Sequence, residues 1–179
     1  MRAEWDHLAR KVMYDAAREL FGPSSWTLDV VEVSGRAFEN LLMWRSYTAL
    51  ENIDVCDVDD YETFPLADLI VLDQVLEHVR APLDALFMLR SALKPGGRLF
   101  VATPFLIRIH PSPVDLWRWT PAGLVQLMNW AGFKNVDASA WGNRAAVVEN
   151  FDGWATVAPG SDMTNEPHFP VTVWAVGTR

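Results

Sequence analysis

The segment "LDQVLEHVRAPLDALFMLRSALKPGGRLFVATP", residues 72–104, decides the fold class of this chain. It begins at the end of "LADLIVLD", residues 66–73, whose run of Leu, Ile and Val predicts a strand buried on both faces. Pro82 suits the first turn of a helix, and "LKPGG" ends that helix in a tight turn. "RLFVATP", residues 98–104, predicts a second buried strand. A strand, helix, strand order of this kind is typical of a mainly parallel sheet covered by helices on both sides.

The same alternation extends in both directions along the chain. Thr120 and Pro121 form a helix start, and Gly132 is placed to end that helix. Residues 2–21 predict an N-terminal helix whose apolar face is formed by Trp5, Leu8, Val12, Ala16 and Leu20. Further strands are predicted at 28–33, 46–51, 135–141 and 169–177. Alternating polarity places the strand at 135–141 near an edge of the sheet.

Composition excludes several classes of protein. The chain has 179 residues and a net charge of -8, which disfavours binding to nucleic acid. Its apolar runs are too short to cross a bilayer, and no export signal is recognisable, so we expect a cytoplasmic protein without membrane contact. Cys56 is the single cysteine, which excludes a disulfide framework. His7 and His168 have no partners at metal-ligand spacing, so we predict no metal site.

Acidic residues gather where the predicted strands end. Ligands of parallel sheets bind beyond these carboxyl ends. Neither "GxGxxG" nor "GxxxxGK" is present, so NAD and ATP are disfavoured. Glu51 follows the first strand by about twenty residues, a spacing that suits the two hydroxyls of a ribose. The pattern favours an adenosine without phosphates.

In this order, "VVEVSG", "ALE", "DQVLEHV", "LRSALKPGGRLFVATP" and "AGF" resemble the class I S-adenosylmethionine-dependent methyltransferases, over residues 28–133. The resemblance is to the small-molecule branch of this family. It implies a Rossmann-like, doubly wound, mainly parallel sheet of seven strands, with helices on both faces. One domain, 1–179, would consist of an N-terminal helix at 1–22, a cofactor-binding core at 28–133, and C-terminal strands with an acceptor-side loop at 134–179.

The first loop departs from the family pattern. That pattern reads acidic-x-Gly-x-Gly, whereas this chain has Glu32, Ser34, Gly35 and Arg36. S-adenosylmethionine carries an aminoacyl group instead of a pyrophosphate at this point, so one glycine can suffice for a close approach. "HPSPVDLWRWT", residues 110–120, resembles a segment found in a minor branch of the family that has the same "SG" loop.

The resemblance implies a set of cofactor-binding residues at the strand ends: Glu32, Ser34, Gly35, Glu51, Asp57, Asp73, Gln74 and His78. Structural alternatives stay open. Glu32 could cap the following helix, Glu51 could be a solvated turn residue, and His78 could cap helix backbone. Glu77 is assigned a structural role.

Transfer of a methyl group to a hydroxyl requires removal of a proton. We expect His110 to be the general base and Asp115 its orienting partner, because both lie in the loop over the expected methyl group. Alternatively, Asp115 pairs with Arg118 and the segment is a structured lid with His110 on its surface. Trp117, Trp119, Trp141 and Trp154 could roof the acceptor pocket.

The sequence therefore predicts an S-adenosylmethionine-dependent O-methyltransferase that acts on a small molecule or a sugar, as a monomer or homodimer. The alternative is a catalytically silent relative, a binding or scaffold module that has kept the sheet and lost the cofactor. A nicotinamide-dependent enzyme is disfavoured because its phosphate-binding turn is missing.

Overall fold

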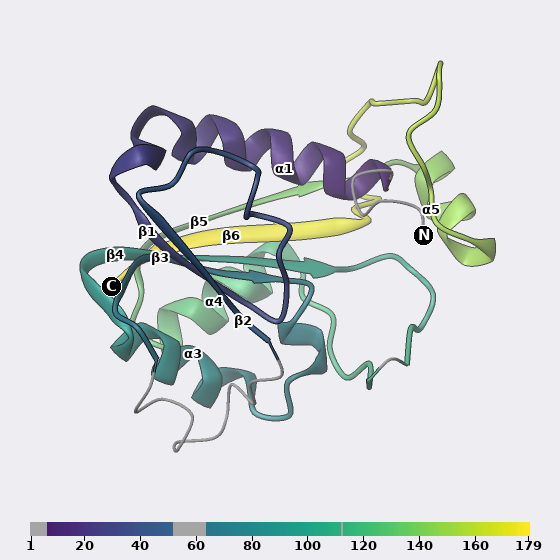
Figure 1. The fold of residues 1–179 in the computed structure, drawn as a ribbon. Helices are drawn as coiled ribbons and strands as arrows, with labels where there is room; N and C mark the ends of the chain where they lie inside the picture. Colours follow the sequence, from purple (N-terminus) through teal and green to yellow (C-terminus); the bar gives the residue numbers. More distant parts are fainter. Residues whose placement is uncertain (1–6, 52–63, 112) are drawn as a thin grey trace.

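A computed structural model describes residues 7–51, 64–111 and 113–179. Its centre is one six-stranded sheet in the order β2-β1-β3-β4-β6-β5 (Figure 1). The strands are β1 (Asp29–Val33), β2 (Ser46–Leu50), β3 (Ala67–Asp73), β4 (Leu93–Pro104), β5 (Lys134–Trp141) and β6 (Thr172–Thr178). Each of the predicted strands is therefore present, with shifts of a few residues at its ends.

The sheet is mixed and not fully parallel. β1 pairs in parallel with β2 and β3, and β3 pairs in parallel with β4. β6 runs antiparallel to both β4 and β5. The resemblance implies seven strands, whereas the sheet in the described ranges has six. β5 is an edge strand, as its alternating pattern predicted.

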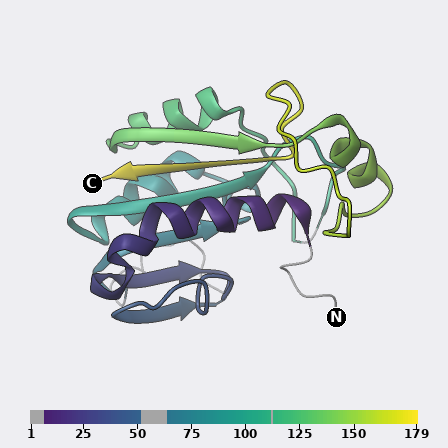
Figure 2. The ribbon, with the colours of Figure 1, turned by 90° about the horizontal axis from the view of Figure 1, so that it is seen from above.

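Helices cover the two faces of the sheet, which is clear when Figures 1 and 2 are compared. α1 (Leu8–Phe21) lies on one face and continues into η2 (Gly22–Thr27), while α3 (Pro82–Ser91) and α4 (Pro121–Trp130) lie on the other. A short η3 (Leu76–His78) follows β3, and α5 (Arg144–Asp152) lies beside the carboxyl ends of the parallel strands. No helix in the described part of the chain is both long and apolar enough to cross a membrane.

Successive residues of the central strands face opposite cores. Val31, Ile70 and Leu72 pack with α3 and α4, whereas Val30 and Leu69 pack with α1. This burial of both faces is the reason why the strands are apolar at successive positions. Burial of this apolar area is the main stabilising contribution to the fold.

The buried face of α1 differs from the expected stripe. Its buried residues are Leu8, Met13, Tyr14, Ala17 and Phe21. Of the predicted positions, Leu20 is exposed, Val12 and Ala16 are half-buried, and Trp5 lies outside the described residues. The helix is rotated because the aromatic rings of Tyr14 and Phe21 pack against Phe38 and Phe100, a contact that helical spacing alone cannot reveal.

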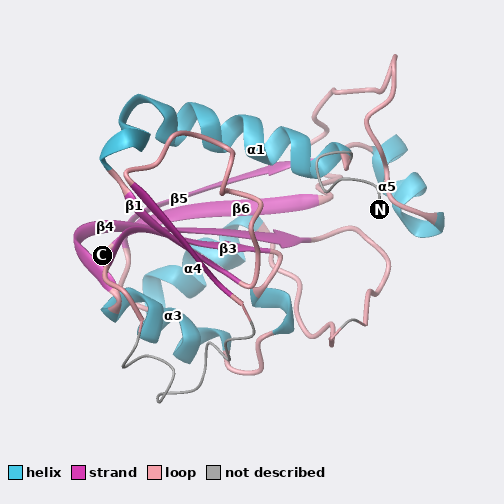
Figure 3. Ribbon diagram, in the orientation of Figure 1, coloured by secondary structure: helices cyan, strands magenta, loops and turns pink. Residues whose placement is uncertain are grey.

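The connection between β1 and β2, residues 34–45, consists of turns, and Figure 3 shows it as loop. Phe38 in this segment is fully buried and fills the space beside α1 on that face. The structural alternative for Glu32 assumes a helix directly after β1, and residues 34–45 contain none. α5, in contrast, was not predicted.

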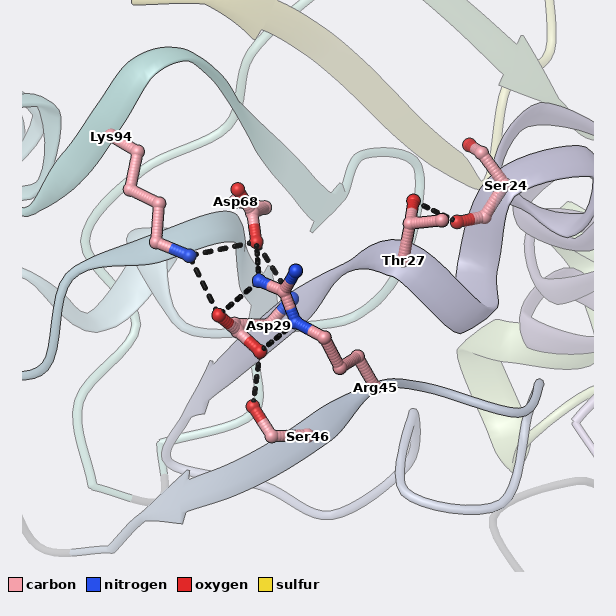
Figure 4. A network of polar contacts seen from close by, with 7 residues as sticks. All are labelled: Ser24, Thr27, Asp29, Arg45, Ser46, Asp68 and Lys94. Carbon is pink, nitrogen blue, oxygen red and sulfur yellow. Dashed lines mark hydrogen bonds and ion pairs between the residues drawn. The ribbon is translucent and has the colours of Figure 1, made fainter.

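A cluster of charged side chains joins the amino-terminal ends of the central strands (Figure 4). Asp29 at the start of β1 accepts hydrogen bonds from Arg45, from Lys94 at 2.6 Å and from Ser46 at 2.7 Å. Lys94 and Arg45 also reach Asp68 of β3, each at 2.9 Å. The guanidinium of Arg45, with Lys94 and Ser46, holds the pKa of Asp29 well below its usual range. The cluster therefore ties four strand segments together at the edge opposite the predicted site.

We expect Asp29→Asn to lower the free energy of unfolding by about 1 kcal/mol at pH 7, because partly exposed ion pairs contribute modestly. A depressed pKa stabilises the fold above the pKa of the unfolded chain, and this contribution is lost as the pH falls through the native pKa. The deficit should therefore shrink below about pH 4. Urea denaturation of both proteins at pH 7 and at pH 3 measures this difference in the free energy of unfolding. Asp15→Asn, which removes an exposed pair on α1, is the control with a smaller effect.

Candidate active site

The carboxyl ends of the parallel strands carry two cavities on the same edge of the sheet. One, of about 330 Å³, is lined by Ser34, Gly35, Arg36 and Glu51 and lies beyond β1 and β2. The other, of about 380 Å³, includes Gln74 and Pro104 in its wall and lies beyond β3 and β4. Ligands of open α/β sheets bind at this edge. We therefore take this edge as the candidate active site.

Glu32 is buried at the end of β1 and organises the loop that follows. Its carboxylate accepts hydrogen bonds from the main-chain N–H groups of Ala37 at 2.9 Å and Phe38 at 2.8 Å. The hydroxyl of Tyr47 on β2 donates a third, at 2.6 Å. Burial raises the pKa of Glu32 above its ordinary value, while these three donors oppose the rise. Glu32 caps a turn and not the helix that the structural alternative required.

Two residues give the loop its unusual path. Ser34 has φ of 60°, a left-handed conformation in which glycine is favoured, and its N–H donates to the carbonyl of Leu50 at 2.7 Å. A Cβ atom at Gly35 would lie 2.8 Å from a carboxylate oxygen of Glu32. Glycine at position 35 is therefore required by the carboxylate beneath it. Ser34 occupies the position of the first glycine in the family pattern. Its positive φ is the reason why glycine is favoured at that position.

Glu51 lies immediately after β2, as expected for a ribose ligand. Its carboxylate accepts a hydrogen bond from the Nε of Arg36 at 2.8 Å, and both side chains are more than half exposed. An exposed ion pair of this kind contributes little and is readily exchanged for other partners. Asp57, which the resemblance places among the cofactor-binding residues, lies outside the described residues.

The end of β3 carries Asp73 and Gln74. Asp73 accepts a hydrogen bond from the hydroxyl of Tyr14 at 2.6 Å, but its buried Oδ1 has no hydrogen-bond partner in the part of the chain that the structure describes. Gln74 has φ of 57° and donates its N–H to the carbonyl of Ala102 at 2.9 Å. A buried, unpartnered carboxylate oxygen suits a cationic group such as an ammonium.

A group of three side chains lies beside the larger cavity. His78 and His110 line it, and their rings meet edge to face at 5.0 Å between centroids. Glu77 is completely buried behind them, and its Oε1 lies 3.7 Å from Nε2 of His78 and 3.9 Å from Nε2 of His110. Burial raises the pKa of Glu77 to about 8, and burial lowers the pKa of His110 below its ordinary value. His78 therefore lies next to His110 in the wall of the larger cavity, and not in the wall of the cavity that contains Glu51.

The loop after β4 is fixed over this group by hydrogen bonds. His78 Nδ1 donates to the carbonyl of Val114, and Leu116 donates its N–H to the carbonyl of Glu77 at 2.9 Å. The indole of Trp117 donates to the carbonyl of Val79 at 2.9 Å. His78 thus bonds to the neighbouring loop and not to a helix end. The described residues of this segment, 110–111 and 113–120, form a structured cover.

Asp115 positions the main chain of this cover. Its Oδ2 accepts the N–H of His110 at 3.0 Å and a hydrogen bond from Arg118 at 2.6 Å. The pKa of Asp115 is lowered, chiefly by Arg118. The carboxylate thus bonds to the backbone of His110, and the expected orientation of the His110 ring by Asp115 does not match this geometry. Asp115 pairs with Arg118, as the alternative prediction stated. His110, however, faces the larger cavity and not the surface.

The tryptophans predicted to roof the site divide into two kinds. Trp154 lines the larger cavity, with the guanidinium of Arg108 over its ring at 4.6 Å. Trp119 and Trp141 are buried in the apolar cores, so they serve packing. Trp117 stacks on Trp119.

Sequence reasoning missed Glu77 as a member of the site. The adjacent Glu and His directly beyond a buried strand are the signal that could have revealed it.

Comparisons with solved structures connect this geometry to a class of enzyme. A S-adenosylmethionine-dependent methyltransferase from Archaeoglobus fulgidus superposes with a TM-score of 0.59 at 11% identity, over 96% of this chain and 95% of that one. A Thermotoga maritima protein, described as a possible histamine N-methyltransferase, gives 0.58 at 16% identity, over 94% and 89%. A Burkholderia thailandensis O-methyltransferase family protein gives 0.51 at 14%, over 95% and 59%. A search of curated proteins found no match.

The fold is thus that of class I S-adenosylmethionine-dependent methyltransferases. The model of the methyltransferase domain family matches residues 7–138, more than half of the chain, and the chain belongs to this family. Its cofactor is S-adenosylmethionine. The residues present fit that cofactor: the glycine at 35 permits a close approach, and the unpartnered oxygen of Asp73 suits its amino group.

We expect Gly35→Ala to weaken binding of S-adenosylhomocysteine by about tenfold or more, because overpacking against Glu32 costs roughly 1–3 kcal/mol and displaces the loop. Isothermal titration calorimetry measures the affinity. Gly22→Ala is the matched control, since its new Cβ meets only ordinary contact with Leu42 at 3.7 Å. Equal affinity in both variants would contradict the role of Gly35.

Proposed function

We propose that this protein transfers a methyl group from S-adenosylmethionine to a hydroxyl oxygen of a small molecule or a sugar. The observation that carries the proposal is the pair of cavities on one edge of the sheet, with the carboxylate of Glu51 in the wall of the first and the imidazoles of His78 and His110 in the wall of the second. The first suits the nucleoside of the cofactor. The second suits the acceptor.

On the cofactor side, the proposed ligands are spread along the ends of three strands. Glu51 would accept hydrogen bonds from the ribose hydroxyls in exchange for Arg36. The loop of Ser34 and Gly35 would pass close to the aminoacyl part, and Asp73 with Gln74 would lie at its amino group. Asp57 stays a prediction for the adenine. Because these groups are acidic and neutral, they suit a positively charged nucleoside without phosphates.

On the acceptor side, bound S-adenosylmethionine would supply a methyl group on a cationic sulfur. The side chains around the cavity would hold the hydroxyl in line with it and exclude water. The hydroxyl proton has to leave as the new bond forms. His110 is the predicted base, and its lowered pKa leaves the ring neutral and able to accept a proton at pH 7.

The cavity wall is consistent with a small polar acceptor. Trp154 offers a flat apolar surface of the kind on which sugars and aromatic rings bind. Asn150 and Thr172 contribute amide and hydroxyl groups to the same wall. An acceptor with hydroxyl groups beside an apolar face matches both features.

We expect Glu51→Ala to weaken S-adenosylhomocysteine binding by more than about tenfold, since hydrogen bonds to a charged group contribute about 1.5–3 kcal/mol. Calorimetric titration measures the affinity, and circular dichroism checks the fold. Glu39→Ala is the control, because Glu39 also pairs with Arg36, at 3.3 Å, but does not line the cavity. Unchanged affinity in Glu51→Ala would refute the ribose role. Failure of the unaltered protein to bind the ligand would refute the proposed function.

A further inference from the structure

The three side chains beside the larger cavity form an arrangement that proton transfer alone does not explain. One oxygen of Glu77 and one ring nitrogen each from His78 and His110 lie within 4.8 Å of one another. The contacts from Glu77 to the two rings, at 3.7 and 3.9 Å, are too long for hydrogen bonds. Both are shorter than about 4.2 Å, the sum of two bonds from a zinc ion to its ligands. The spacing therefore suits a shared cation.

Glu77 gives independent support for a cation. Its side chain is completely buried, and neither carboxylate oxygen has a hydrogen-bond partner among the described residues. Burial of an unpaired carboxylate is costly, and buried charges are normally paired or bound to metal ions. One of the two unpartnered oxygens is the atom that faces the two imidazole nitrogens.

His78 is oriented as a metal ligand would be. Its Nδ1 faces the carbonyl oxygen of Val114, which can only accept a hydrogen bond, so Nδ1 carries the proton. In the neutral ring, Nε2 then has a free lone pair, and this nitrogen lies 3.7 Å from Oε1 of Glu77. Metal-binding histidines commonly donate their other ring N–H to a backbone carbonyl in this way.

We propose that Glu77, His78 and His110 bind one divalent ion of the zinc type, with an open coordination position toward the cavity. Two imidazoles and one carboxylate favour Zn²⁺ over Mg²⁺, which prefers oxygen ligands and water. Three protein ligands with one open position are the usual composition of catalytic zinc sites. The expectation of no metal site considered only His7 and His168, which are not part of this group.

This inference rests on the proposed function in one respect, the hydroxyl acceptor. An acceptor hydroxyl at the open position would have its pKa lowered by the ion. Its oxygen lone pair would form the bond to the methyl carbon, the carbon–sulfur bond would break with its electron pair returning to sulfur, and the hydroxyl proton would leave to water. Nothing is oxidised or reduced. With the ion bound, His110 would be a ligand and not the base.

Calorimetric titration of the EDTA-treated protein with ZnCl₂ tests the site. We expect one ion per chain, and at least about tenfold weaker binding in Glu77→Gln and in His110→Ala, because even loss of an outer-shell partner costs a metal site that much. His168→Ala, in an exposed loop, and MgCl₂ are the controls; the first should bind zinc normally, and the second should not bind. Absence of stoichiometric zinc binding, or its retention in both site variants, would overturn the inference.

A second measurement, on the unaltered protein, keeps the inference testable if a variant folds poorly. The visible absorption of bound Co²⁺ reports nitrogen and oxygen coordination in the unaltered protein, and it should be missing from folded His110→Ala. Titration of the same preparations with S-adenosylhomocysteine separates the two proposals. Binding of this ligand without zinc binding overturns the metal site and leaves the proposed function. Zinc binding without it supports the metal site and refutes the proposed function.

Discussion

The site depends on one buried carboxylate, that of Glu32. It leaves the end of β1 and turns beneath the following loop, where it accepts two main-chain N–H groups and the hydroxyl of Tyr47 on β2. A charge in this position is stable only because all three donors are present. The carboxylate thereby fixes the loop path, the pairing of β1 with β2 near the cavity, and the requirement for glycine at 35. The proposed cofactor contacts on this side therefore follow from how one side chain is hydrogen-bonded.

Much of the fold could be predicted because the central strands are buried on both faces. The sequences of β3 and β4 are apolar at successive positions, a pattern that is typical of strands in a sheet between two helical layers. The segment after β1 could not be predicted in the same way. Phe38 is buried there through contacts with Tyr14 and Phe100, which are distant in the sequence. The count of seven strands came from the resemblance, and no local pattern supported the seventh.

The residues of the candidate site also differ in how far their positions could be predicted from the sequence. Residues placed directly by a strand end, such as Glu51 and Asp73, could be predicted because parallel strands bring their carboxyl ends to one edge. Glu77 and His78 lie one turn farther, in η3, where the side-chain directions depend on the 3₁₀ geometry. The relation of Asp115 to His110 also required the structure, because a spacing of five residues in a loop does not show whether a carboxylate faces the ring or the backbone.

The two ends of the parallel strands perform opposite tasks. At the amino-terminal edge, the carboxylates of Asp29 and Asp68 form ion pairs with two cationic side chains, Lys94 and Arg45, and these pairs hold the strands together. At the carboxyl edge, Ser34 and Gln74 adopt left-handed conformations that cost of order 1 kcal/mol or more each, and several buried carboxylate oxygens have no partner in the described chain. A fold tolerates such local costs only where the rest of the structure enforces them. The unpartnered carboxylate oxygens of the described chain all lie at this edge, and a cation beside Asp73 or Glu77 would offset the cost of burying them.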